Sequence, residues 1–434
     1  MTDRVITAVG AMRVWDSRGH PTVEVQITLS DGTTARAIAP AGASRGSREA
    51  VDLRDGGTRL KGLDVQQALA NVAGPIARAL IGRDVADQAG GDAAMIAADA
   101  SPFKSGLGGN ALVATSLAML HAAAAGRPLW QHLAQTCQCK PSIPLPEIQI
   151  FGGGAHAGRR VDVQDFMVMV PGAASFDEAL AITAEVYHAA GAIMARTGRS
   201  FGVADEGGWW PAFGSNEEAL ETLTEAIVAA GEVPGKRVVI SLDIAASEFG
   251  RGGQYRLALE DRVLGSDQMI ALLGRWIDTY PIVAIEDPLA EDDPDGMRAF
   301  TQTFGDRVQV VGDDYLVTNA GLVARAAAQQ ACNTVLIKVN QAGTVTEAIA
   351  ALNAARKAGF RAIVSARSGE TEDVSISHLA TGLNAGQLKV GSFARSERMA
   401  KWNECLRIEK ALGPGHFVAG APLAGTRWGR ASPA

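Results

Sequence analysis

Five short apolar segments of the sequence each end in an ionisable residue. These residues are Asp243, Glu286, Asp313, Lys338 and Lys389. Apolar runs of this length predict strands buried on both faces, as in a parallel sheet. Because the carboxyl ends of parallel strands meet at one edge, we expect three carboxylates and two ammonium groups to converge on one rim. Charged groups are costly to bury, so their presence there indicates a functional site rather than packing.

The three carboxylates predict a metal site. Asp243, Glu286 and Asp313 come from three different strand ends, and the sequence places no His or Cys beside them. Oxygen ligands alone suit a hard cation such as Mg²⁺. The alternative is that each acidic residue caps the helix after its strand, as single Asp residues commonly do. Two lysines at the ends of later strands favour the metal site.

The two lysines predict proton abstraction. A lysine buried at a strand end loses hydration, and a nearby divalent cation lowers its pKa. We expect Lys338 and Lys389 to depress the pKa of one another further, which makes one of them a candidate general base. The chemistry implied is removal of a proton from a carbon next to a carboxylate, with the metal ion stabilising the negative charge that develops.

Alternating strands and helices would position these residues. From about residue 147 onward, apolar strand segments alternate with helical runs such as 266–278 and 344–358. Capping boxes that begin at Ser175 and Ser215 predict two of the helix starts. Repeated βα units over this length predict an α/β fold, a (β/α)₈ barrel with its site at the C-terminal ends of the strands. A doubly wound open sheet is the alternative, but no GxGxxG motif follows an early strand.

The first part of the chain has a different pattern. Residues 4–38 alternate in the manner of a three-stranded meander, and residues 64–125 have the composition of helices. The glycine-rich stretch 104–109 interrupts these helices, and we interpret it as the entry to a helix. The small-residue loop 40–46 between the meander and the helices is either a flexible connection or a mobile lid over a ligand. A proline-rich stretch, PSIPLP, marks a boundary. We therefore expect an N-terminal α+β domain at 1–140 and a barrel domain at 141–434.

Composition describes an ordinary globular protein. Hydrophobic residues make up 47%, charged residues 20%, and the formal net charge is −7, which gives no reason to expect nucleic acid or a membrane as a partner. The absence of a recognisable leader or long apolar run predicts a cytoplasmic protein. Cys137 and Cys139 with His132 could form a metal clip, but no second ligand pair follows at the usual spacing. The Gly-, Ala- and Pro-containing tail at 419–434 is expected to be loosely ordered.

Short motifs along nearly the whole chain resemble those of the enolase family. They are DSRGHPTVEV (16–25), GAS (42–44), ADEGG (204–208), SLDIAASEF (241–249), IEDPLAEDD (285–293), VGDD (311–314), IKVNQAGT (337–344), SGETED (368–373) and ARSERMAKWN (394–403). The resemblance implies an N-terminal α+β domain and an eight-stranded βα barrel whose first units are irregular. It also implies an Mg²⁺-dependent hydro-lyase, a phosphoglycerate-like substrate and a homodimer or an assembly of dimers.

The resemblance also implies roles for individual residues. The family's metal ligands match three residues already singled out: Asp243, Glu286 and Asp313. Ser44 matches the lid residue that reaches a second metal ion. Arg367 and Ser368 match the residues that hold the phosphoryl group.

The same resemblance implies which groups move protons. Lys338 matches the base that removes the α-proton, and Lys389 matches the lysine near the substrate carboxylate. Glu206 matches the acid that assists loss of the β-hydroxyl, and His156 matches a histidine on a second lid. Asp165 stands where the family has a glutamate, which shortens the reach of its hydrogen bond.

The chain departs from the family beside the phosphoryl group. Ala366 stands where the family has a histidine, and Arg45 replaces a threonine of the first lid. Arg159 and Arg160 follow the lid histidine. We expect the loss of a charged, hydrogen-bonding group there to cost an ordinary enolase much of its rate.

These departures predict a modified substrate. Extra space and extra arginines fit a phosphorus atom that bears an additional carboxylate, which Arg binds with two parallel hydrogen bonds. Such a substrate is a glycerate whose 2-oxygen carries phosphonoformate in place of phosphate. One alternative is 2-phosphoglycerate, the substrate of glycolytic enolase. The other is an inactive relative with a structural or binding role, against which the retention of the whole ionisable set argues.

Overall fold

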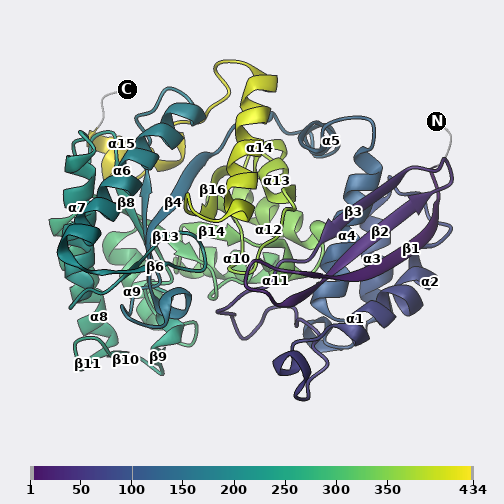
Figure 1. The fold of residues 1–434 in the computed structure, drawn as a ribbon, viewed down its shortest axis with the longest axis horizontal. Coiled ribbons are helices and arrows are strands. Elements are labelled where there is room, and N and C mark those ends of the chain that lie inside the picture. Colours follow the sequence, from purple (N-terminus) through teal and green to yellow (C-terminus); the bar gives the residue numbers. More distant parts are fainter. Residues whose placement is uncertain (1–3, 100, 432–434) are drawn as a thin grey trace.

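The molecule has two parts, a three-stranded sheet packed on helices and a closed barrel surrounded by helices (Figure 1). The computed structural model describes residues 4–99 and 101–431. Among the helices in these two ranges, none is both long and apolar enough to cross a bilayer.

The N-terminal part is an antiparallel meander. Its strands are β1 (Ile6–Trp15), β2 (Pro21–Leu29) and β3 (Thr34–Ile38), hydrogen-bonded in that order. Helix α4 (Gly109–Ala124) packs on β2 and β3 and is buried along almost its whole length. The other helices of this part are α1 (Gln66–Asn71), α2 (Ala77–Leu80), α3 (Gln88–Ala98) and α5 (Leu129–Thr136). The meander predicted for the start of the chain is confirmed.

The helical stretch is interrupted between α3 and α4. The carboxylate of Asp99 accepts hydrogen bonds from the backbone N–H groups of Ser101 at 2.9 Å and Leu107 at 2.7 Å. The interruption predicted at 104–109 is confirmed, with α4 beginning at its end, and it extends back to Asp99. The chain is also non-helical at 81–87, between α2 and α3, where helix was predicted. A side chain that binds nearby N–H groups offers the backbone an alternative to the helix, which is why Asp favours turns.

Eight strands close the barrel. They are β4 (Leu145–Gly152), β5 (Asp165–Met169), β8 (Val239–Asp243), β12 (Ile282–Glu286), β13 (Gln309–Gly312), β14 (Thr334–Ile337), β15 (Arg361–Ser365) and β16 (Gly386–Gly391). Strand β16 pairs with β4 and completes the ring. Strand β5 is antiparallel to both its neighbours, β4 and β8, because a loop with only a short 3₁₀ turn joins it to β4. The predicted eight-stranded barrel is confirmed, with the irregular start that the family resemblance implies.

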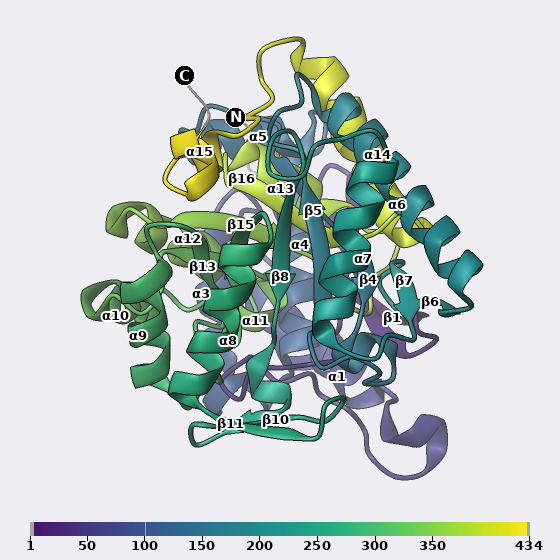
Figure 2. The same cartoon turned by 90° about the vertical axis from the view of Figure 1, so that its left-hand side faces the viewer.

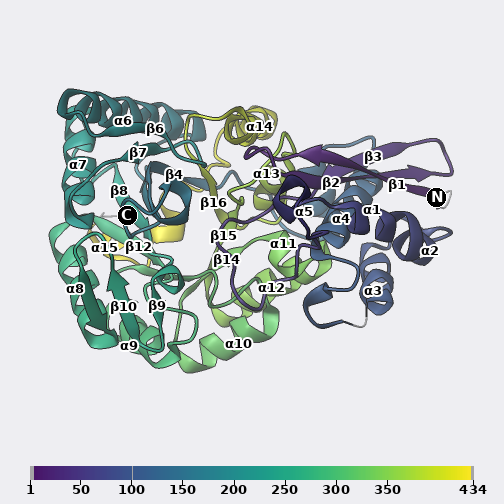
Figure 3. The same cartoon turned by 60° about the horizontal axis from the view of Figure 1, so that its bottom comes forward.

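Helices surround the strands. Figure 3 shows α6, α7, α8, α9 and α10 following one another around the outside of the barrel. The barrel helices are α6 (Phe176–Thr197), α7 (Asn216–Ala229), α8 (Ser266–Thr279), α9 (Pro294–Phe304), α10 (Ala320–Gln329), α11 (Val339–Ala342), α12 (Val345–Ala358), α13 (Ser375–Gly382) and α14 (Ser396–Leu412). Both predicted helix starts are confirmed: the hydroxyls of Ser175 and Ser215 accept N–H groups from Glu178 and Glu218. The reciprocal bond goes one residue further back than in a capping box, since the two glutamates accept the N–H groups of Ala174 and Gly214.

Two short hairpins lie among the barrel loops. One is formed by β6 (Ser200–Val203) and β7 (Trp209–Pro211), between α6 and α7. After β8 and a short 3₁₀ turn, β9 (Gly250–Arg251), β10 (Gln254–Leu257) and β11 (Arg262–Gly265) form a small three-stranded sheet that includes the second hairpin, β10–β11.

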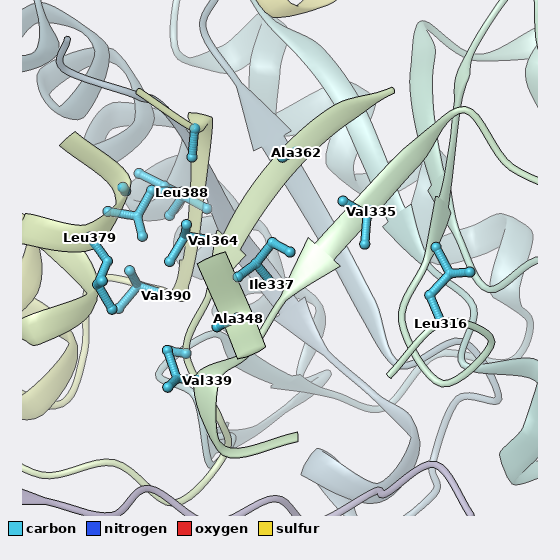
Figure 4. Close-up of a cluster of buried hydrophobic side chains, with 14 of the residues drawn as sticks. Leu316, Val335, Ile337, Val339, Ala348, Ala362, Val364, Leu379, Leu388 and Val390 are labelled. Atoms are coloured by element: carbon cyan, nitrogen blue, oxygen red, sulfur yellow. The ribbon is translucent and has the colours of Figure 1, made fainter. Parts of the chain in front are cut away.

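The barrel strands are buried on both faces, as their apolar runs predict. Val335 and Ile337 of β14 belong to the cluster between strands and helices, together with Val364 and Leu388 (Figure 4). Leu336, between them in sequence, instead forms an interior cluster with Val311 and Ile363. Successive side chains of a strand point to opposite faces, so a strand with helices outside and side chains inside must be apolar throughout.

The C-terminal tail is folded rather than loosely ordered, so that prediction is wrong for the described residues up to 431; residues 432–434 lie outside them. A 3₁₀ turn (Ala421–Leu423) and helix α15 (Arg427–Ala431) lie at the opposite end of β8 from the β10–β11 hairpin (Figure 2). Leu423 packs with Leu145, Met169, Val239 and Val283, which lie where their strands meet the bottom of the barrel. The tail covers apolar side chains that would otherwise face water.

Truncation of this contact tests its contribution to stability. Leu423 is fully buried, so Leu423→Ala should lower the free energy of unfolding by about 2–5 kcal/mol through lost burial and a cavity. Urea unfolding followed by tryptophan fluorescence measures the change. Val263→Ala, at a side chain that is 61% exposed, is the control and should change it by less than about 0.5 kcal/mol. Equal effects of the two substitutions would contradict a packed tail.

Candidate active site at the barrel mouth

Lys389 joins two of the predicted metal ligands. Its ammonium donates to Asp243 Oδ2 at 2.8 Å and to Glu286 Oε2 at 2.9 Å. Asp243 and Glu286 end the neighbouring strands β8 and β12 and are paired in their register. Burial by itself would lower the pKa of Lys389, but the two carboxylates outweigh it and raise that pKa well above its usual value. The ammonium therefore stays charged and acts as a cation between them.

Lys338 pairs with the third carboxylate. Its ammonium donates to Asp313 Oδ2, and the amide of Gln341 donates to Asp313 Oδ1 at 2.7 Å. Burial lowers the pKa of Lys338 and Asp313 raises it, with a net rise, while Lys389 acts in the lowering direction. The prediction that the two lysines have depressed pKa values is wrong for the chain by itself. Lys389 does lower the pKa of Lys338, as predicted, but the carboxylate of Asp313 raises that pKa by more.

The two ammonium groups keep the three carboxylates apart. Asp243 and Glu286 share Lys389, whereas Asp313 pairs with Lys338. The carboxylate oxygens of the predicted triad therefore do not all lie within 4.8 Å of one another, unlike the ligand atoms of the tight clusters in the described part of the chain. Three buried negative charges repel one another unless a cation lies between them, and here the lysines supply that positive charge.

Two oxygens at this place nevertheless suit a bound cation. Glu286 Oε1 and Gln164 Oε1 are buried and have no hydrogen-bond partner among residues 4–99 and 101–431. Gln164 Nε2 donates to Asp243 Oδ2 at 3.1 Å, which places Gln164 beside the same carboxylate. Buried oxygens are rarely left without a partner, and oxygen donors are the ligands that Mg²⁺ prefers. The residues present therefore fit a divalent cation at Asp243 and Glu286.

A neighbouring acidic group, Asp287 with Asp313 and Asp314, does form a tight cluster. Asp287 accepts the backbone N–H of Asp313 at 3.0 Å and that of Asp314 at 2.7 Å, one with each oxygen. Burial raises the pKa of Asp287 well above its ordinary value. We interpret Asp287 as a brace that fixes the loop after β13, because both its oxygens are already used by the backbone.

His156 connects the two loops that approach the mouth from β4 and from the β6–β7 hairpin. Its Nδ1 lies 3.3 Å from Asp165 Oδ1, and its Nε2 lies 3.7 Å from Glu206 Oε1. The backbone N–H of Asp205 donates to the carbonyl of His156 at 3.2 Å. The structure thus brings Glu206 to His156 and Asp165, which lie some 40 to 50 residues earlier in the sequence, and each of the three is buried.

This cluster carries strongly shifted pKa values. Burial alone would lower the pKa of His156, but Glu206 and Asp165 raise it to about 9. Burial alone would raise the pKa of Asp165, but His156 and Lys389 hold it far below its usual range. Lys389 Nζ lies 3.5 Å from Asp165 Oδ2, so the histidine cluster and the metal-ligand carboxylates form one charged network.

The small-residue loop 40–46 covers the end of β15. The N–H of Ala43 donates to Ser368 Oγ at 2.7 Å, and Arg367 Nη2 donates to the carbonyl of Ser44 at 3.0 Å. Both residues expected to hold a phosphoryl group therefore contact this loop. The contacts favour the lid interpretation over that of a flexible connection.

Arg367 is paired with a residue of the N-terminal part. Its guanidinium donates to Glu49 Oε2 at 2.8 Å and to Asn340 Oδ1 at 3.0 Å. Burial opposes its charge, but Glu49 raises the pKa of Arg367 above its usual value. The fully buried Arg398 donates to the backbone carbonyls of Arg367 and Ser368 from below, so this part of the site is fixed from both sides.

Ala366 follows β15 at the barrel mouth. It is buried, and its N–H donates to the carbonyl of Lys389 at 2.9 Å. Its methyl group belongs to the main hydrophobic cluster. Because an alanine offers neither charge nor a side-chain hydrogen bond, the polar side chains at this end of β15 are those of the next two residues, Arg367 and Ser368.

The arginines expected beside this alanine have other partners. Arg159 Nη2 lies 2.7 Å from Glu248 Oε2, and the guanidinium of Arg160 lies 3.8 Å from the ring centroid of Phe201. Arg45, like the other two, is exposed. The predicted convergence of all three beside the alanine is therefore not observed, because a surface carboxylate and an aromatic face are the nearer partners.

The suggested metal clip is not observed either. His132, Cys137 and Cys139 are not among the metal-capable groups of the described part of the chain. Cys139 Sγ instead lies 3.7 Å from Arg356 Nη1, and the cysteines are free thiols.

Several polar residues of the site escape prediction from sequence. Glu147 and Gln149 face the barrel interior from β4, where the amide of Gln149 donates to Asp165. Their alternation within the otherwise apolar segment LPEIQIF is a signal that could have revealed them, because residues two apart share a face of a strand. Glu49 and Gln341 carry no such signal, since their contacts join distant parts of the chain.

The pairing of His156 predicts a dependence of stability on pH. A group whose pKa is 6.5 when unfolded and about 9 when folded stabilises the protein fully below pH 6.5 and loses that effect as the pH rises through 9. The difference in unfolding free energy between wild type and His156→Gln should therefore shrink by about 3 kcal/mol over this range. Urea unfolding at stepped pH measures it, and a constant difference would contradict a protonated His156.

Comparison with known protein families covers both parts of the molecule. Residues 6–133 match the family model of the enolase N-terminal domain. Residues 140–426 match the family model of the enolase C-terminal TIM barrel domain. The two matches take in the meander, the lid over β15 and the whole ring of strands that carries the lysines and carboxylates. The chain is therefore a member of the enolase family.

Proposed function

We propose that the protein is an Mg²⁺-dependent lyase that removes water from a glycerate carrying a phosphoryl-type group on its 2-oxygen. The observation that carries this proposal is the arrangement of Asp243, Glu286 and Asp313 around Lys338 and Lys389 at the barrel mouth. Family membership supports a lyase. The buried oxygens without partners support a cation at the same place.

Asp243, Glu286 and Asp313 would hold the metal ion, and Ser44 on the lid would approach a second one. Bound Mg²⁺ would stabilise the negative charge that builds up on the substrate carboxylate when the neighbouring carbon loses its proton. The lid, closed over Arg367 and Ser368, would exclude water from the reacting atoms.

The chain's own groups account for the proton movements. Lys338 would take the proton from C2 of the substrate after losing its own, which requires another cation to neutralise its partner Asp313. Lys389 would bind the substrate carboxylate. The electron pair left at C2 forms the new double bond to C3 as hydroxide leaves C3. Glu206 would assist that departure by delivering a proton, so that water is the product, with His156 and Asp165 holding Glu206 in place.

Removal of the base tests this assignment. Lys338→Gln should lower kcat by roughly 10²–10⁴-fold, because the α-proton then has no positioned acceptor. Enolpyruvate formation, followed by absorbance, measures the rate. Lys357→Gln, at an exposed lysine of α12, is the matched control and should leave kcat unchanged. An unimpaired Lys338→Gln enzyme would exclude Lys338 as the base.

We propose further that the substrate carries phosphonoformate rather than phosphate, which is the reaction of a carboxyphosphonoenolpyruvate synthase in phosphinothricin-type antibiotic pathways. The support is Ala366, which leaves the phosphoryl side without the charged group that the family has there. The three arginines do not add support, since Arg159 and Arg160 contact other surface groups and Arg45 is exposed. Conversion of 2-phosphoglycerate to phosphoenolpyruvate is the alternative, because the metal and lysine set would serve either substrate.

A comparison of the two substrates distinguishes these reactions. We expect kcat/KM for 2-(phosphonoformyl)glycerate to exceed that for 2-phosphoglycerate by at least roughly tenfold, the effect of one good polar contact. Ala366→His should raise kcat/KM for 2-phosphoglycerate by restoring a hydrogen-bonding cation near the phosphate. Rapid turnover of 2-phosphoglycerate by the wild-type enzyme would refute the phosphonoformyl substrate but not the lyase chemistry.

A further inference from the structure

Glu147 is a buried carboxylate inside the barrel that the proposed reaction does not use. It is 1% exposed, and its Oε2 has no hydrogen-bond partner in the described part of the chain. Its Oε1 accepts a hydrogen bond from the hydroxyl of Ser241. Burying a carboxylate with one oxygen unpaired lowers the stability of the fold, and a buried group of this kind usually has a hydrogen-bonding or charged partner in another state of the protein.

The position of Glu147 relates it to Lys389. The two residues are paired in the register of the neighbouring parallel strands β4 and β16, so their side chains leave the sheet on the same face at the same level. The long stem of Lys389 then carries its ammonium up to Asp243 and Glu286 at the mouth. Glu147 therefore lies near the base of the lysine side chain, while the ammonium lies at its tip.

The ammonium and a divalent cation compete for the same carboxylates. Lys389 contacts Asp243 Oδ2 and Glu286 Oε2, so a cation bound to these carboxylates, for example through the free Glu286 Oε1, would repel the ammonium at short range and favour a position further away. The third carboxylate near it is Asp165, at 3.5 Å. Asp165 Oδ1 is engaged by His156 and Gln149, whereas Asp165 Oδ2 has no hydrogen-bond partner among the described residues, so Asp165 is the rival acceptor for a displaced ammonium. Asp165 already has His156 as a cationic partner, whereas no ion pair joins Glu147 to a cation in the described part of the chain. A buried ammonium without a close carboxylate would be strongly destabilised.

We propose that Glu147 is the counter-ion that receives Lys389 when Asp243 and Glu286 bind a cation. This inference depends on the proposed metal site. Glu147 is then a positioning residue, because it acts through the lysine and not on the substrate. In the cation-free protein it is nearly idle, since burial raises its pKa and Lys389 only partly opposes that effect. Once the ammonium turns towards Glu147, the carboxylate is stabilised in its charged form.

The proposal predicts that Glu147→Gln weakens metal binding without harming the cation-free protein. Gln keeps the shape and can still accept the hydrogen bond from Ser241, but it cannot neutralise the displaced ammonium. Isothermal titration with Mg²⁺ alone should show a dissociation constant raised roughly 10–100-fold, the usual effect of losing a group that supports metal ligands. The thermal midpoint measured in EDTA should stay at the wild-type value, while the upward shift on adding Mg²⁺ should become smaller.

Two further variants separate charge from structure. Ser241→Ala removes the hydrogen bond to Glu147 but keeps the carboxylate, so its Mg²⁺ affinity should stay within about threefold of wild type, well short of the loss expected for a missing supporting group. Glu147→Asp retains the charge and should bind Mg²⁺ more tightly than Glu147→Gln. If Ser241→Ala weakens binding as much as Glu147→Gln, or if Glu147→Gln binds like wild type, the counter-ion role is refuted.

A crystal structure of the wild-type protein soaked with Mg²⁺ gives a readout that does not depend on the folding of any variant. Lys389 Nζ is expected within hydrogen-bond distance of Glu147. An ammonium that stays on Asp165 or on Asp243 would overturn the proposal. If wild-type protein does not bind Mg²⁺ at all, the proposed function fails together with this inference, whereas binding that is indifferent to Glu147 refutes the inference alone.

Discussion

Neutralisation of buried carboxylates is the constraint on which the rest of this structure depends. Asp243, Glu286 and Asp313 lie at the end of a barrel whose walls are apolar, where unpaired charges are strongly disfavoured. Lys338 and Lys389 balance them in the protein alone. This balance explains why the lysines keep their protons here and why the carboxylates do not gather into one cluster. A divalent cation at these carboxylates would compete with the ammonium groups for the same negative charge.

The same constraint explains the contribution of the N-terminal domain. Arg367 is buried at the barrel rim, and its charge is balanced by Glu49 from the segment that follows the lid. Glu49 also accepts a hydrogen bond from Gln341, which in turn donates to Asp313. A continuous chain of polar contacts thus runs from the lid to a proposed metal ligand. Such networks hold side chains in one arrangement because each member would be unsatisfied in another.

Only a small part of this network bears on which substrate the protein binds. The lysines, the carboxylates and the histidine cluster would serve any member of the enolase family, so they say little about which glycerate is bound. Ala366 is the informative position, because the family resemblance implies a charged group there, whereas the methyl group of this alanine packs in the hydrophobic cluster. The exposed arginines looked equally informative in sequence, but Arg159 and Arg160 turn out to bind Glu248 and Phe201 on the surface.

The sequence by itself determined the barrel and the strand-end residues. Apolar runs that end in Asp243, Glu286 and Lys389 are a local pattern. Such a run predicts a strand reliably when the strand is buried on both faces, because each of its side chains must then be apolar. Tertiary structure alone decided which charges meet. The pairing of Glu147 with the base of a distant lysine, the pKa of that lysine and the folding of the tail around Leu423 all arise from contacts between remote segments. Electrostatic energy depends on distance and burial, and neither quantity is written in the spacing of residues along a chain.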